Sequence, residues 1–321
     1  MLVATATVAL YVGVPQVAGL KDTWGRLSTG DPAWFVAALL CEAGSYAAYV
    51  LTFHRVFAPR CPRIGWRESY DISLAGVAAS RLFALAGAGG IALTAWALRR
   101  SGMGRRALLS GLTTFFAALY AVYMAALVLA GMGLRTGVLA GPAPLGVTVV
   151  PALFGAFVIA AALAIAATSR PADVADGVRG AVALLRDRDV ALLGAVCWWA
   201  LDIAVLAACF RAFGPPPPAG VLVMAYFTGM LANVLPFPGG LGGVEGGMIG
   251  AFLAFGVDGG LAVAVVLSYR AFAYWLPMVP GAVSYVRLSR SGLTRLPSRS
   301  VLRTPSARAT TDAPPCRPRD S

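Results

Sequence analysis

The chain has 321 residues, of which 59% are hydrophobic and only 12% are charged, and its formal net charge is +12 at pH 7. One soluble core of this size cannot bury so much apolar sequence, which excludes an ordinary soluble protein. The positive charge is mostly arginine between apolar runs and near the C-terminus, and no basic patch carries interleaved aromatic residues, so we expect membrane topology and no nucleic-acid partner. The sequence therefore predicts an all-α polytopic membrane protein of the cell membrane.

Six apolar runs are long enough to cross a bilayer as helices. The first lacks a basic segment before it and is followed by further spans, so we expect an uncleaved helix and no signal peptide. In chain order the runs are Leu2 to Leu20, Trp34 to Phe53, Ala107 to Ala130, Leu145 to Ala167, Val190 to Phe210 and Leu261 to Val286. Between the fourth and fifth runs we expect a loop that carries several arginines.

Two further apolar segments, Ile72 to Leu98 and Ala219 to Phe255, contain helix breaks. A shift of 153 positions superposes their glycines, and paired interruptions in two halves are typical of transporters with internal repeats. The identical pairs are Gly76, Ala79, Leu82, Gly87, Gly89 and Gly90 over Gly229, Ala232, Leu235, Gly240, Gly242 and Gly243. In the second segment Pro236, Pro238 and Gly239 add to the break.

Arginine positions indicate how these segments enter the membrane, because cytoplasmic loops are rich in arginine. Arginines flank the first segment on both sides and are scarce around the second, so the first begins and ends in the cytoplasm and the second begins and ends outside. The flanking residues are Arg55, Arg60, Arg63 and Arg67 before the first segment and Arg99, Arg100, Arg105 and Arg106 after it. An arrangement with eight full crossings keeps the same end locations.

The predicted architecture is an inverted repeat, in which each half has three transmembrane helices and one re-entrant, or short paired, helical hairpin. Half 1 covers about residues 1–135 and half 2 about 140–288, which together form one transmembrane domain. Residues 289–321 are rich in Arg, Pro and Ser and are expected to form a disordered cytoplasmic tail.

Charged residues inside apolar sequence are the candidate functional residues, because such groups are costly in a membrane unless they are paired or solvated. We expect Arg81, Asn233, Glu245 and Arg270 to bind substrate. Three structural alternatives stay open: Glu245 as a helix cap, Arg270 in a purely structural ion pair, and Arg81 reaching toward the membrane surface.

Glu42 and Asp202 lie in overlapping spans of the two halves, where acids either relay protons or pair with a neighbouring hydroxyl. Cofactor and metal signals are not found: His54 is the single histidine, and the five cysteines have neither zinc spacing nor a disulfide pattern. Histidine-based catalysis is therefore not expected, nor is any cofactor or metal.

The stretch Tyr226 to Val257, YFTGMLANVLPFPGGLGGVEGGMIGAFLAFGV, followed by a helix bearing Ser268-Tyr-Arg270, resembles the flippase-like transmembrane region of the bacterial lysylphosphatidylglycerol synthases. The resemblance implies a module that translocates lipid. Bifunctional members carry a cytosolic domain that transfers an amino acid from aminoacyl-tRNA to lipid, and we expect that activity to be absent here. The first hairpin departs from the pattern, because Phe83 and Ala86 stand where the second has Pro236 and Gly239.

The functional hypothesis is binding of an anionic or aminoacylated phospholipid, or a lipid-linked intermediate, and its movement between leaflets without ATP. Two alternatives stay open, a membrane-embedded lipid-modifying transferase that uses Glu245 and a scaffold that transports nothing. The expected partner is membrane phospholipid, with a homo-oligomer and a separate synthetase or transferase left open.

Overall fold

The structure, a computed structural model, describes residues 30–82, 88–168, 173–234 and 242–290. In these ranges every regular element is helical and no β-strand occurs. The elements are α3 (Pro32–Phe57), η1 (Ala58–Arg60), α4 (Trp66–Leu82), α5 (Ala88–Arg100), α6 (Arg105–Arg135), α7 (Leu145–Thr168), α8 (Asp173–Arg186), α9 (Val190–Phe213), α10 (Ala219–Met230), η2 (Leu231–Val234), α11 (Gly243–Ala254), α12 (Gly259–Arg270), the π-helical segment η4 (Ala271–Trp275) and α13 (Met278–Arg290).

Five helical stretches in the described ranges are long and apolar enough to cross a membrane. They are α3 with η1, α6, α7, α9, and the run from α12 to α13. These stretches coincide with the second to sixth predicted spans, so the all-α polytopic fold is confirmed. The predicted span from Leu2 to Leu20 lies outside the described residues, as does the chain from residue 291 onward.

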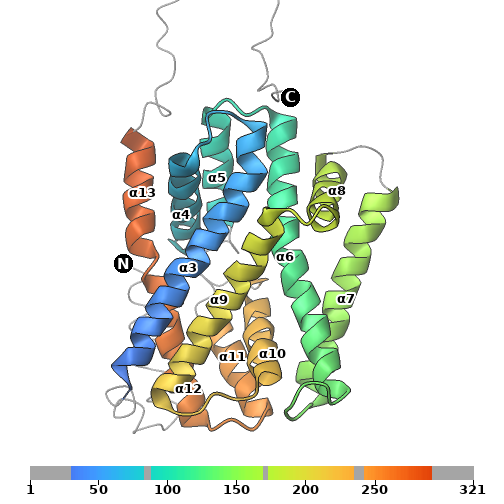
Figure 1. Cartoon of the computed structure of the whole chain (residues 1–321), viewed down its shortest axis with the longest axis vertical. Coiled ribbons are helices and arrows are strands. Elements are labelled where there is room, and N and C mark those ends of the chain that lie inside the picture. Colours follow the sequence, from blue (N-terminus) through green and yellow to red (C-terminus); the bar gives the residue numbers. More distant parts are fainter. Residues whose placement is uncertain (1–29, 83–87, 169–172, 235–241, 291–321) are drawn as a thin grey trace, which may run out of the picture.

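The two interrupted segments form helical hairpins that occupy opposite ends of the molecule, α4 and α5 in the upper half and α10 and α11 in the lower half of Figure 1. These helices have 17, 13, 12 and 12 residues. At 1.5 Å per residue the longest spans about 26 Å, less than the roughly 30 Å of a hydrocarbon core. The lengths favour the re-entrant form, while the inverted repeat stays a prediction.

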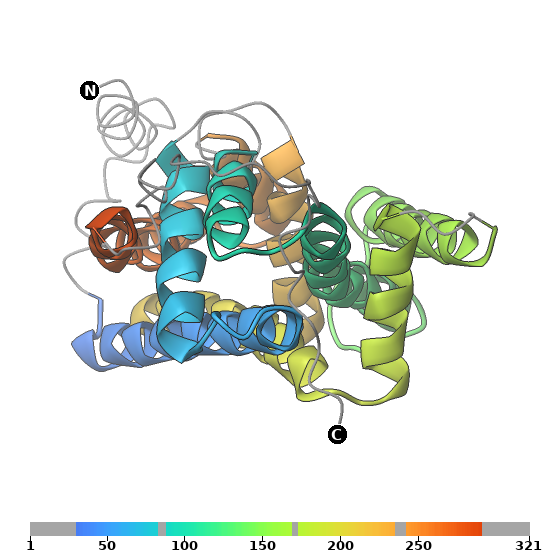
Figure 2. The same cartoon turned by 90° about the horizontal axis from the view of Figure 1, so that it is seen from above.

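A helix lies where the sequence predicted a loop between the fourth and fifth spans, which corrects that prediction. This helix, α8, crosses the molecule beside α6 and α7 (Figure 2). It packs closely because a Cβ on Gly180 would meet Thr114 Oγ1 at 2.6 Å, and the same hydroxyl donates to the carbonyl of Gly177 at 3.0 Å. A search for apolar runs of spanning length misses α8, since its apolar residues form only one stripe.

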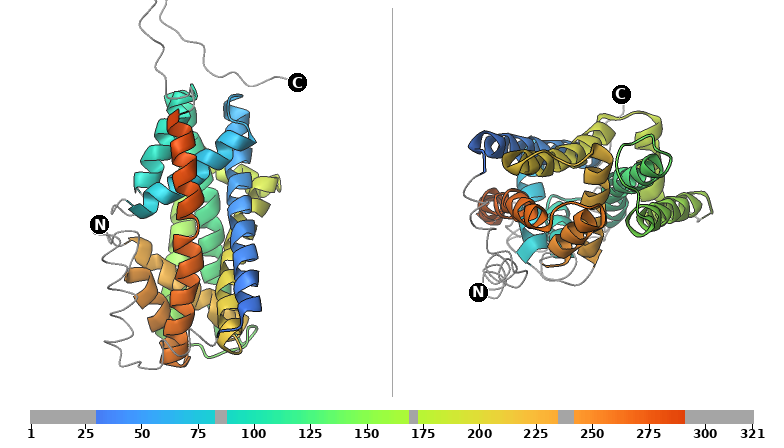
Figure 3. Two further views of the ribbon diagram at one scale, coloured as in Figure 1. Left: turned by 90° about the vertical axis from the view of Figure 1, so that its left-hand side faces the viewer. Right: turned by 90° about the horizontal axis from the view of Figure 1, so that it is seen from below.

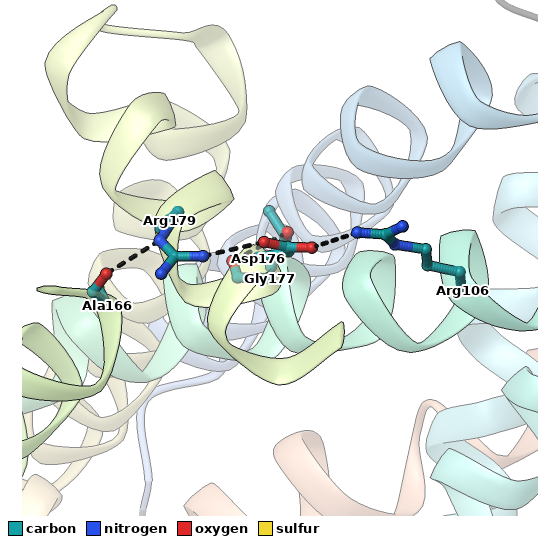
Figure 4. Close-up of polar contacts among 6 residues, drawn as sticks. Arg106, Ala166, Asp176, Gly177 and Arg179 are labelled. Carbon is teal, nitrogen blue, oxygen red and sulfur yellow. Dashed lines mark hydrogen bonds and ion pairs between the residues drawn. The ribbon is translucent and has the colours of Figure 1, made fainter. Parts of the chain in front are cut away.

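Polar contacts around Asp176 connect α8 to its neighbouring helices (Figure 4). Its carboxylate accepts hydrogen bonds from Arg106 and Arg179, both at 3.0 Å, and Arg179 Nε donates to the carbonyl of Ala166 in α7 at 2.9 Å. The hydrogen bond from Arg106 holds the pKa of Asp176 below its ordinary value, and Arg179 acts in the same direction. These contacts lie at the surface, so salt screens them and they position α8 more than they stabilise it.

The antiparallel helices α3 and α9 pack against one another along one side of the molecule (Figure 3). Asp31 and Asp189 cap the two N-termini, each accepting a backbone N–H two residues on. Along the pair Ser45 Oγ donates to the carbonyl of Trp198 at 3.0 Å and Thr52 Oγ1 to that of Ala191 at 3.2 Å. These bonds satisfy hydroxyls that the bilayer cannot solvate.

Close backbone approach holds the second hairpin together. A Cβ on Gly229 of α10 would meet the backbone N and Cα of Met248 in α11 at 2.8 and 2.9 Å. No comparable neighbour surrounds Gly250 of α11, where a Cβ would meet nothing within 4 Å. Only the first of these glycines is therefore required by packing.

Replacing Gly229 with Ala is expected to lower the free energy of unfolding by about 1–3 kcal/mol, because the methyl group forces α10 and α11 apart. The matched variant Gly250→Ala should leave stability unchanged or raise it by up to about 1 kcal/mol through helix propensity. Thermal unfolding midpoints of the detergent-solubilised variants measure the difference, and equal midpoints would contradict the close approach.

Candidate functional site

A cavity of about 560 Å³ lies among α3, α4, α6, α7, α9 and the α12–η4 segment. Its volume is within the range of small-ligand pockets. Four charged side chains line it: Glu42, Arg81, Asp202 and Arg270. The aromatic residues of its wall are Tyr46, Tyr49, Phe116, Tyr120, Tyr123, Phe154, Trp198, Trp199, Tyr269 and Tyr274.

The cavity borders the outer surface of the molecule at α6 and α7. Two of its lining residues, Tyr120 of α6 and Phe154 of α7, are 51% and 43% exposed. The exposed side chains of α7 beyond the cavity are apolar, among them Leu153 and Phe157, as expected of a helix that faces lipid. Part of the cavity wall is therefore formed by side chains that also contribute to the apolar outer surface.

Arg270 and Glu245 form a buried ion pair. Arg270 Nε lies 2.7 Å from Glu245 Oε1, and the residues are only 6% and 2% exposed. Glu245 is near the N-terminus of α11, and its Oε2 also accepts the N–H of Gly242 at 2.8 Å. The structure therefore shows both a helix-cap contact and an ion pair at Glu245, whose cation is Arg270, while substrate binding by these residues stays a prediction.

Arg81, at the end of α4, binds the π-helical segment of the last span. Its guanidinium donates to the carbonyls of Ala273 at 2.5 Å and Tyr274 at 2.6 Å and to the hydroxyl of Tyr46 at 2.6 Å. A π turn offers carbonyls that an α-helix would use internally, and buried carbonyls need donors. Arg81 thus stabilises η4, and three of the five N–H donors of an arginine are committed to these contacts.

Tyr274 contacts both cavity arginines. Its ring centroid is 5.3 Å from the Arg81 guanidinium carbon and 4.7 Å from that of Arg270, and its hydroxyl donates to the carbonyl of Arg81 at 3.1 Å. The negative face of the ring attracts both cations, which offsets part of their mutual repulsion. Two guanidinium groups are thereby held near one another on the cavity wall.

Asp202 and Glu42 form a second charged group on the wall, contributed by α9 and α3. Asp202 accepts hydrogen bonds from the hydroxyls of Tyr226 and Tyr269, the latter at 3.0 Å. The carboxyls of Glu42 and Asp202 are close enough to share a hydrogen bond. The sequence analysis left two roles open for Asp202, a proton relay and pairing with a neighbouring hydroxyl. The structure shows hydroxyl partners for this residue.

The structure brings together Arg81, Arg270, Glu42 and Asp202, with Glu245 behind Arg270. The backbone of Asn233 lies in η2, and its side chain is outside the described part. Gly89 and Gly90 belong to the first turn of α5, and Gly242 and Gly243 to the start of α11. Gly87, Pro236, Pro238, Gly239 and Gly240 lie outside the described residues.

Sequence reasoning did not single out the tyrosines of the site, Tyr46, Tyr226, Tyr269 and Tyr274. A tyrosine in an apolar helix has no distinctive spacing, so its pattern does not reveal a polar role. One signal was available: Tyr46 lies four residues after Glu42, which places both on one face of α3.

Fold and cavity together define a multi-pass integral membrane protein with a charged cavity within its helical bundle. Residues 1–281 match the family described as the lysylphosphatidylglycerol synthase TM region, and the chain belongs to that family. Two proteins of Methanothermobacter thermautotrophicus, both named UPF0104 membrane protein, are 34% and 31% identical to it over 106 and 86 residues. These alignments cover 32% and 26% of the chain and 30% and 26% of the relatives, so the chain spans under a third of either relative.

Removing one partner of the Arg270–Glu245 pair should destabilise the protein strongly. Arg270→Met leaves a buried carboxylate without its cation and is expected to cost about 3–5 kcal/mol of unfolding free energy. The double variant Arg270→Met/Glu245→Gln should regain most of this loss, as measured by thermal unfolding in detergent.

The surface pair Arg55–Asp189 is the matched control, with side chains 46% and 26% exposed. Arg55→Met should cost less than about 1 kcal/mol. If the double variant at the buried pair is as unstable as Arg270→Met, the loss comes from packing and not from the unpaired charge.

Proposed function

We propose that this protein binds the phosphate of a membrane phospholipid with Arg81 and Arg270 and moves that lipid between leaflets. The observation that carries the proposal is a pair of arginines on the wall of a lipid-bordering cavity. Guanidinium groups suit phosphate because their planar donors match its oxygens. The cavity accommodates the headgroup while the acyl chains stay in the bilayer beside α6 and α7.

Movement between leaflets requires the cavity to open alternately to each side, and the α3–α9 pair supports such a mechanism. Ser45 and Trp198, which are hydrogen-bonded, are separated by 153 residues, the same shift that relates the two halves of the sequence. The hydrogen bond from Thr52 to Ala191 fits the same symmetry. Under the 153-residue shift Ala191 corresponds to Ala38, and Ala38 and Thr52 are the same number of residues before and after Ser45 in the sequence. An antiparallel pair related by a two-fold axis at Ser45 has this register, which supports the inverted repeat.

The arginine-rich helix ends support a cytoplasmic location for the upper end of Figure 1. At this end of the molecule lie the end of α3, the start of α4, the end of α5, the start of α6, helix α8 and the end of α13. Arginines at these places include Arg55, Arg67, Arg100, Arg105 and Arg290. In this orientation the end of α13 faces the cytoplasm, which supports the proposal that the C-terminus of this plasma-membrane protein is cytoplasmic.

The transferase alternative has less support, because both carboxylate oxygens of Glu245 are already bound, one by Arg270 and one by the N–H of Gly242. The scaffold alternative gives no reason for charged groups around a cavity, where desolvation costs free energy. Transport without ATP, a proton relay through Glu42 and Asp202, a homo-oligomer and a separate synthetase partner stay predictions.

Lipid transfer in reconstituted vesicles tests the function. Arg81→Lys keeps the charge, loses the planar fork, and is expected to slow transfer of fluorescent phosphatidylglycerol by about tenfold or more, on the scale of one charge-assisted hydrogen bond. The matched control is Arg135→Gln, an exposed arginine outside the cavity that donates to Ala143. Normal transfer by Arg81→Lys, folded by size-exclusion chromatography, would contradict phosphate binding at Arg81.

Cysteine labelling tests the orientation. Single cysteines at Arg67 and Arg100, introduced into a cysteine-free background, should both react with a membrane-impermeant maleimide only after the inner face is exposed, because both ends of the first hairpin are cytoplasmic. A cysteine at Arg211 should react from outside. Reaction of the first two from opposite faces would show that the first segment crosses the membrane.

A further inference from the structure

Glu42 lines the cavity, and one of its two carboxyl oxygens, Oε2, is buried without a hydrogen-bond partner among the described residues. The residue is 2% exposed, and its Oε2 accepts no hydrogen bond among the described residues. Its neighbour Asp202 accepts two tyrosine hydroxyls. An unsatisfied buried acceptor costs free energy, so this oxygen is suited to a ligand that donates a hydrogen bond.

Aromatic rings form the wall beside this oxygen. Tyr46 and Tyr49 follow Glu42 on α3, and the ring centroids of Tyr49 and Trp198 are 5.0 Å apart. Rings attract cations through their faces, and ammonium groups are bound in proteins by aromatic side chains together with carboxylates.

The cavity therefore has two poles of opposite charge. Arg81 and Arg270 form the positive pole, and the hydrogen-bonded acids Glu42 and Asp202, which hold one proton between them, form the negative one. Tyr46 links the two poles: its hydroxyl accepts a hydrogen bond from Arg81 at 2.6 Å, and it lies on the same helix, α3, as Glu42. Glu245, which the sequence analysis expected to bind substrate, is occupied by Arg270, and Glu42 keeps an acceptor without a partner among the described residues.

We propose that the cavity is a site for a zwitterionic lipid headgroup, with its phosphate on the arginines and its primary ammonium on Glu42 beside Asp202. This inference rests on the proposed function, because it assumes that lipid phosphate binds at the arginine pole. A primary ammonium is favoured over a quaternary one, since Oε2 needs an N–H donor and a trimethylated nitrogen has none.

The test is lipid competition measured by native mass spectrometry on the full chain in nanodiscs. Phosphatidylethanolamine, phosphatidylcholine and phosphatidylglycerol with identical acyl chains compete for the protein. We expect phosphatidylethanolamine to be retained about tenfold or more over the other two, the scale of one hydrogen bond to a charged group. In Glu42→Gln this preference should fall to about onefold, while phosphatidylglycerol stays bound through the arginines.

Asp71→Asn is the matched control, because Asp71 is an equally buried acid of α4 that does not line the cavity. It should keep the preference. Loss of the preference in Asp71→Asn, or its survival in Glu42→Gln, would overturn the ammonium site. The unmodified protein provides a further test that does not depend on the folding of any variant. If it retains phosphatidylcholine and phosphatidylethanolamine equally, the ammonium site is also overturned.

Two further results separate this inference from the proposed function. If the protein retains every phospholipid equally and Arg81→Lys abolishes retention, the phosphate site stands and the ammonium site is wrong. If no phospholipid is retained, the proposed function itself is wrong. Soluble O-phosphoethanolamine, which lacks acyl chains, should compete only weakly; competition as strong as that of the lipid would overturn the assignment to a lipid headgroup.

Discussion

The buried ion pair between Arg270 and Glu245 is the interaction on which the rest of the site depends. It joins the last span to the N-terminus of α11 and so connects the second hairpin to the last span. Arg270 also lies against Tyr274, whose other neighbour is Arg81 of the first hairpin. One set of contacts therefore connects both hairpins through the last span, and Arg81 extends it to Tyr46 on α3.

Stability alone does not account for these contacts. A buried ion pair gains little over well-packed apolar side chains, because desolvation of the two charges offsets their attraction. The π-helical segment is likewise less favourable than a continued α-helix and needs Arg81 to satisfy its carbonyls. Charged groups and an irregular helix at one place are expected of a site that binds a charged ligand, where stability is given up for function.

Sequence patterns predicted the spans in the described residues well, because a helix must have an apolar stretch of a certain length to cross a bilayer. They also brought Arg81, Arg270, Glu42 and Asp202 to attention, since charge within apolar sequence is conspicuous. Pairing was harder to predict: Arg270 and Glu245 are close because α11 and α12 fold back on one another, and no periodicity encodes that contact. α8 was missed for a related reason, because a short amphipathic helix against α6 is stabilised by tertiary packing.

The position of the acids relative to the α3–α9 pair gives them a mechanical significance. The hydrogen bond between Ser45 and Trp198 marks the centre of this antiparallel pair, and Glu42 and Asp202 lie about one turn from it on either helix. The two hairpins show the same correspondence, since Gly76 approaches Thr94 and Gly229 approaches Gly247, each related by the 153-residue shift. In the proposed mechanism the halves rock about this centre, so the acids would lie where displacement is smallest and a headgroup could keep its contacts while access changes from one side to the other.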